Sequence, residues 1–233
     1  MSILTDFRDE ARRRGLLRAD EGVTLDSVFR LVRDMPWAPA SDLDPATAIA
    51  EWRGTGREKH LLLAALLDGL GYETGLIAAT HEFAPESAPW LPSHLLDEVR
   101  AAPVPDVQLL LRVQTNRMLE EWVTVDASWP LAAGRLGLPV NERIVPGSDH
   151  RLACDPIEVF HIPSTAAHAE FDADDENDDD APPPIEAIVE RILRDHVGDE
   201  PGAWQRRERF VASLASWLAA TTEGAEDASP DVR

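Results

Sequence analysis

The chain has 233 residues, of which 44% are hydrophobic, so it is long enough for one large domain with a buried core. Its 43 acidic and 22 basic residues give a formal net charge of −21. This charge argues against a nucleic-acid or anionic-membrane surface, because phosphate contacts need clustered cations. The single cysteine, Cys154, excludes an internal disulfide and a cysteine-rich zinc site.

The distribution of charge and hydropathy predicts a cytoplasmic protein. No apolar run approaches the roughly 20 residues that a bilayer requires, and the N-terminal stretch MSILTDFRDEARRRG lacks an apolar signal core. Lys59 is the only lysine. An arginine-rich, acidic composition fits either a GC-rich genome or a salt-rich cytoplasm, and the sequence leaves both open.

The N-terminal third is predicted to be helical. Apolar spacing predicts helices over residues 1–18 and 24–34, the second with Thr24 as N-cap, and Asp44-Pro45 begins a third that runs to about Trp52. After the break Gly54-Thr55-Gly56, a fourth helix from about Arg57 to Leu70 is apolar almost all round, which is typical of a buried central helix.

The middle of the chain alternates in the manner of strands. Strands are predicted over 74–83, 106–114, 121–126 and 157–162, with a short amphipathic stretch at 95–99. Thr115-Asn116-Arg117 is predicted to be the loop of a hairpin. The pattern therefore favours an α+β fold, with a buried central helix on an antiparallel sheet and helices flanking it at both ends.

The chain divides into four segments. Residues 1–163 form the main domain, and 164–183 form an acidic, proline-rich linker. Residues 184–220 are expected to form two helices that pack on the core, and 221–233 a frayed, disordered tail.

Several segments resemble the transglutaminase-like proteins of the papain-like superfamily. They are WRGTGREKHLLL at 52–63, GYETGLIAATHEF at 71–83, DVQLLLRV at 106–113, WVTVDASWP at 122–130 and GLPVNE at 137–142. The resemblance spans about residues 50–162. It implies a papain-like core in which a catalytic cysteine begins the buried helix, where the helix dipole and a neighbouring histidine stabilise a thiolate, and an acid orients that histidine.

Carried over residue by residue, the resemblance places Gly56 at the cysteine position, Gln108 at the histidine position and Asp126 at the acid position. If the hairpin turn centres on Arg117, Gln108 lies directly opposite Asp126. Glycine has no nucleophile, and glutamine does not shuttle a proton near neutral pH, so only the acid of the triad pattern is present.

These substitutions indicate a catalytically degenerate protein that serves as a binding or scaffolding module, with a peptide, a protein or a small acyl group as partner. The alternative is a hydrolase, amidase or acyltransferase of the same fold with a relocated nucleophile at Cys154, Thr55 or Ser128. A third reading is a purely structural protein whose cleft is filled by its own side chains.

The candidates for ligand contact are residues near the presumed cleft. They are Trp52, Thr55, His60, His81, Trp122 and Trp129. Each of these residues can also be interpreted as a packing, capping or hydrogen-bonded residue without contact to a ligand. No cofactor or metal site is expected, because the seven histidines lack metal-binding spacing and the acidic run at 170–180 lacks the glycine and glutamate of a calcium loop.

Overall fold

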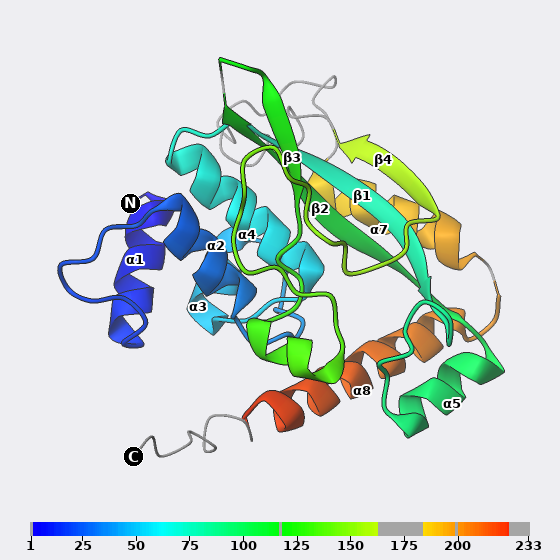
Figure 1. The fold of residues 1–233 in the computed structure, drawn as a ribbon. Helices are drawn as coiled ribbons and strands as arrows, with labels where there is room; N and C mark the ends of the chain where they lie inside the picture. The colour runs from blue at the N-terminus through cyan, green and yellow to red at the C-terminus, as the bar shows by residue number, and fades with distance from the viewer. Residues whose placement is uncertain (1, 117, 163–183, 199, 224–233) are drawn as a thin grey trace, which may run out of the picture.

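The computed structural model describes residues 2–116, 118–162, 184–198 and 200–223. Within these residues the fold is mixed α+β, with one four-stranded antiparallel sheet (Figure 1). The helices are α1 (Ile3–Arg13), α2 (Leu25–Arg33), α3 (Pro45–Glu51), α4 (Gly56–Gly69), α5 (Ser93–Ala101), α7 (Ile185–Val197) and α8 (Ala203–Glu223), with a 3₁₀ helix η1 (Leu131–Leu136). The strands are β1 (Thr74–Phe83), β2 (Val104–Asn116), β3 (Glu121–Val125) and β4 (Glu158–Ile162).

Local capping explains where the N-terminal helices begin. Thr24 and Ser27 form a reciprocal capping box at the start of α2, as the sequence predicts for Thr24. Asp44 accepts a hydrogen bond from Ala46 N at the start of α3, directly before Pro45.

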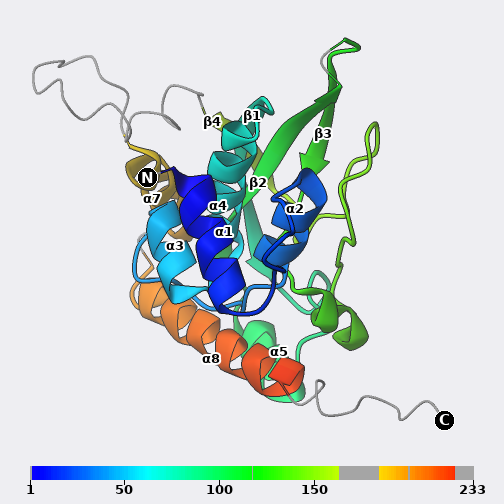
Figure 2. The same ribbon diagram turned by 90° about the vertical axis from the view of Figure 1, so that its left-hand side faces the viewer.

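The strand order is β3-β2-β1-β4, and every pair is antiparallel. Helices α4 and α7 share one buried cluster with one face of β1 and β2, which includes Leu76, Leu109 and Leu111. A second cluster joins Phe83 and Trp129 to α5, η1 and α8. Helices α5 and α8 lie together at one end of the sheet in both views (Figures 1 and 2).

The predicted hairpin register is wrong by two residues. The strands pair Leu111 with Val125, whereas a turn centred on Arg117 pairs Leu109 with Val125. The turn lies later in the chain because Asn116 Oδ1 accepts hydrogen bonds from Met118 N and Leu119 N, and Glu120 adopts a left-handed conformation (φ 50°). A shift of two residues preserves the face, so Gln108 and Asp126 stay on the same side of the sheet.

One boundary at the C-terminal end also differs from the prediction. Helix α8 continues to Glu223, so residues 221–223 belong to a helix and not to a frayed tail. The predicted acidic linker at 164–183 and the rest of the predicted tail, 224–233, lie outside the described residues. Helices α7 and α8 pack into the two core clusters.

Candidate functional site

The first residue of α4, Gly56, faces the side chain of Gln108 on β2. A Cβ atom added at Gly56 would lie 2.1 Å from Gln108 Nε2, 2.4 Å from Oε1 and 2.6 Å from Cδ. These separations are far inside van der Waals contact, so the carboxamide of Gln108 fills the volume in which a side chain at residue 56 would begin. Glycine is the residue that permits this approach.

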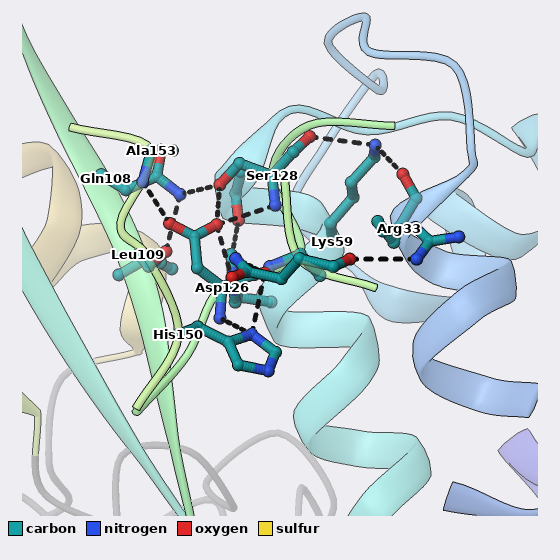
Figure 3. A network of polar contacts seen from close by, with 12 residues as sticks. Arg33, Lys59, Gln108, Leu109, Asp126, Ser128, His150 and Ala153 are labelled. Carbon is teal, nitrogen blue, oxygen red and sulfur yellow. Dashed lines mark hydrogen bonds and ion pairs between the residues drawn. The ribbon is translucent and has the colours of Figure 1, made fainter. Parts of the chain in front are cut away.

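A chain of hydrogen bonds connects Gln108 to Asp126 through Ser128 (Figure 3). Gln108 Nε2 donates to Ser128 Oγ at 2.6 Å, and Ser128 Oγ donates to Asp126 Oδ1 at 2.6 Å. Asp126 Oδ1 also accepts from Ser128 N, and Oδ2 accepts from Ala153 N at 2.6 Å. Gln108, which is half-buried, and the buried Asp126 therefore belong to one network, but Ser128 lies between them and both carboxylate oxygens are occupied.

His60 is held in one neutral tautomer. Its Nδ1 lies 2.5 Å from Gly56 O and therefore donates, whereas Nε2 accepts from Ala127 N at 2.9 Å. Burial lowers the pKa of His60 below its ordinary value, although the Asp126 carboxylate opposes the shift. Both ring nitrogens are engaged with the backbone, so His60 positions the start of α4 and has no free nitrogen to serve as a base.

Lys59 is completely buried beside this network. Its Nζ donates to Arg33 O at 2.8 Å and to Ser128 O at 3.1 Å (Figure 3), which ties α2 and the segment after β3 to α4. Burial lowers the pKa of Lys59 from 10.5 to about 7. In the sequence, the burial of Lys59 is indicated by the position of the only lysine inside an almost wholly apolar helix.

A small pocket opens beside Gln108, at the N-terminal end of α4. Its free volume is about 20 Å³, which is room for about one water molecule. The pocket is lined by polar and aromatic side chains from α4, β1, β2 and α8. Further lining residues come from the segments that follow α2, β3 and Leu152. The lining residues include Trp37, Thr55, Arg57, His81, Asp106, Gln108, Trp129, Cys154 and Arg207.

An ion pair between β2 and α8 forms one wall of this pocket. Arg207 Nε and an Nη atom donate to Asp106 Oδ1 at 3.0 and 2.6 Å, and Val107 N donates to the same oxygen at 2.8 Å. Burial by itself would raise the pKa of Asp106, but Arg207, with Arg57 and His81 nearby, holds it below the ordinary value. This pair could not be predicted from the sequence, because about a hundred residues separate its partners.

The sequence candidates for ligand contact divide into two groups. Thr55, His81 and Trp129 line the pocket, and Thr55 also donates to the Glu58 carboxylate from its backbone nitrogen and its hydroxyl. Trp52 does not line it: this residue stacks on Phe7 in the core. Trp122 lies on β3 opposite Gln114, with 36% of its surface exposed.

The three candidates for a relocated nucleophile have no histidine partner among the described hydrogen bonds. Thr55 bonds Glu58, and Ser128 bonds Asp126 and Gln108. Burial raises the pKa of the Cys154 thiol well above its ordinary value, and neighbouring carboxylates add to the shift, so this thiol is protonated near neutral pH.

Within the described ranges, no group of three or more His, Cys, Asp or Glu residues is arranged to hold a metal ion. In the same part of the chain, no helix has the length and apolar character needed to span a membrane. No protein-family model, curated protein or solved structure matches this chain.

Proposed function

We propose that this chain is a non-catalytic protein with a transglutaminase-like, papain-like fold, and that it acts in the cytoplasm as a binding module through the pocket beside Gln108. The support for the fold is the set of resembling segments, together with the position of Gly56 at the start of a buried helix and its contact with Gln108 of an adjacent strand. Asp126 follows the third strand and joins the same network.

The observation that carries the absence of catalysis is the carboxamide of Gln108 in the space of a side chain at residue 56. A covalent mechanism needs a nucleophile and a base within reach of each other. Here the nucleophile position has no side chain, the base position carries an amide, and His60, which bonds Gly56 O, has both nitrogens engaged with the backbone.

A turnover assay tests this proposal. The wild-type chain is given a fluorogenic amide substrate and, separately, a glutamine-containing peptide with a primary amine. We expect no product above the rate of an Asp126→Asn variant that circular dichroism shows to be folded. Wild-type turnover that disappears in this variant would overturn the proposal.

The double variant Gly56→Cys/Gln108→His provides a second test, in which the reactivity of an introduced thiol is measured. The thiol introduced at residue 56 lies at the positive end of α4 beside an imidazole, so its pKa should lie below that of a strand thiol. The matched control is Gly75→Cys, where an added Cβ meets only ordinary contact at 3.8 Å from Arg112. The measurement is the pH dependence of the iodoacetamide reaction; the native Cys154 reacts slowly because its pKa is raised. Equal pH profiles for the two engineered thiols would contradict the assignment of residue 56.

A further inference from the structure

The two edges of the sheet differ in how their backbone groups are used. At the β3 edge, the chain around His150 bonds to the strand: His150 N donates to Thr124 O, and Thr124 N donates to Asp149 Oδ1. At the other edge, β4 pairs with β1 and with no other strand among the described residues, and Figure 1 shows it at the margin of the sheet. An edge strand leaves N–H and C=O groups of alternate residues without a partner in the sheet. The sheet can therefore be extended at β4.

The β4 strand is fixed at its start and carries exposed apolar side chains. Ile157 N donates to Thr80 O at 2.8 Å, and Glu158 N donates to Thr80 Oγ1 at 3.0 Å. Ile157, Val159 and Phe160 are nevertheless 58%, 53% and 38% exposed. Proteins often protect a free edge with lysine, proline or a covering segment, and β4 contains neither lysine nor proline. The strand is thus held in place for pairing and is only weakly protected against it.

The exposed apolar side chains of β4 lie on both faces of the sheet. Val159 pairs with Ala79 and Phe160 with Ala78, and successive residues of a strand point to opposite faces. An added strand would contact Val159 on one face and Phe160 on the other while its backbone pairs with the edge. A helix laid on the sheet would reach one face only. The arrangement therefore favours an extended partner segment with apolar side chains.

The charges at this edge favour a basic partner. Glu158 is exposed on β4, Asp155 is exposed shortly before it, and neither forms an ion pair within the described part of the chain. No lysine or arginine occurs from Leu152 to Glu190. Opposite charges on adjacent strands stabilise the pair, whereas like charges directly opposite destabilise it. A second copy of the chain would bring a further net charge of −21 to the same edge, which opposes self-association.

We propose that the free edge of β4 binds an extended basic segment of a partner protein, which adds a strand to the sheet through main-chain hydrogen bonds. Apolar side chains of that segment pack on Val159 and Phe160, and its lysines or arginines pair with Glu158 and Asp155. No residue of β4 lines the pocket beside Gln108. This surface therefore goes beyond the pocket function and does not depend on it.

Hydrogen exchange in the presence of a designed peptide tests the proposal. The probe is a short peptide of alternating lysine and valine, acetylated and amidated at its ends. It should slow the exchange of amide groups in β4, and its affinity should fall as salt screens the charges. The same peptide with glutamate in place of lysine should not bind. Unchanged exchange of β4 with the lysine peptide at millimolar concentration would overturn the proposal.

A methylated form of the lysine peptide separates strand addition from general attraction of cations. Methylation of every peptide nitrogen removes the main-chain donors and keeps the charges and the apolar side chains. This form should leave the exchange of β4 unchanged. Equal binding of the methylated and unmethylated peptides would rule out main-chain pairing.

Matched variants locate the binding edge. Val159→Lys removes an apolar contact and adds a like charge, so it should weaken binding of the lysine peptide by about fivefold or more. Leu119→Lys makes the same kind of change at an exposed residue between β2 and β3, and its affinity should equal that of the wild type. Circular dichroism checks that both variants are folded. Equal weakening by the two variants would overturn the assignment to β4.

Sedimentation equilibrium distinguishes a basic partner from a second copy. We expect the wild-type chain and Val159→Lys to be monomers at the concentrations used for peptide binding. A wild-type dimer that Val159→Lys abolishes would assign this edge to a second copy and would overturn the proposed partner.

Discussion

The surroundings of Lys59 oppose the positive charge of its side chain. It is fully buried and donates to two backbone carbonyls, which suits a neutral amine with two N–H groups. Its pKa is lowered by burial to about 7, so the unfolded chain binds more protons than the folded chain between about pH 7 and 10.5. The free energy of unfolding therefore rises with pH across this window.

We expect the free energy of unfolding to increase by about 1 kcal/mol between pH 7.5 and 8.5, because one proton linkage has a limit of about 1.4 kcal/mol per pH unit. Urea denaturation at several pH values measures it. Cys154 adds little in this range, since its thiol is protonated in the folded chain and its ordinary pKa is 9.0.

The matched variant Lys59→Met is unbranched and one heavy atom shorter than lysine, and it removes the titration. Its stability should be nearly flat over the same pH range. An equal rise in the wild type and in Lys59→Met would show that another group is responsible.

At the level of single residues, the sequence predicted part of the site. The resemblance placed Gly56, Gln108 and Asp126 near one another, and the structure joins Gln108 and Asp126 through Ser128. It did not predict that the amide of Gln108 would fill the space at residue 56, because pattern matching assigns positions and not rotamers. Ser128 was expected only as an alternative nucleophile, and not as the link between Gln108 and Asp126.

At the level of elements, the helices and strands were predicted well because their signals are local. Thr24, Asp44-Pro45 and the apolar run of α4 mark their own boundaries. The hairpin register was not predicted, because Met118 and Leu119 look like strand residues in sequence, while the Asn116 side chain draws them into the turn. The 3₁₀ helix at Leu131–Leu136 was also missed, since a short helix lacks a period of its own.

The ion pair of Arg207 with Asp106 fixes α8 to β2, and its loss should be costly. An Arg207→Met variant leaves a buried carboxylate without its counter-ion, so we expect a loss of about 3–5 kcal/mol in the free energy of unfolding, measured by urea denaturation. Arg209→Met, two residues later on the exposed face of α8, should change stability by less than about 0.5 kcal/mol.

A second variant separates the charge from the packing of the arginine stem. Asp106→Asn/Arg207→Met removes both charges and should recover much of the lost stability. A double variant no more stable than Arg207→Met would assign the loss to packing against α8 instead.

For the whole molecule, the dominant electrostatic quantity is the net charge of −21. Like charges at this density oppose the compact state. We expect the melting temperature to rise with salt, and most of the rise to occur below about 0.15 M, where the Debye length falls from about 30 Å at 0.01 M to about 8 Å.

Thermal melts in sodium chloride and choline chloride test this expectation. The two salts should act alike if screening is the cause. A rise that continues into molar concentrations, or one specific to sodium chloride, would contradict simple screening and would favour adaptation to a saline habitat over genome composition.

The arrangement of whole segments was beyond sequence reasoning. The two C-terminal helices were expected to pack on the core, but not to divide between the two buried clusters, with α7 in the cluster that contains α4 and α8 in the cluster of Phe83 and Trp129. Through Arg207 and Val211, α8 also lines the pocket. Contacts between residues so distant along the chain leave no periodic signal.

The close packing of the Gln108 amide against Gly56 restricts the order in which these two residues can be replaced in related sequences. A first mutation that adds any side chain at residue 56 forces the amide out of its place and breaks its bond to Ser128. A first mutation that shortens residue 108 meets no such obstacle. Change at this pair is therefore favoured when residue 108 is replaced first, and related sequences with a larger residue at 56 should carry a smaller or reoriented one at 108.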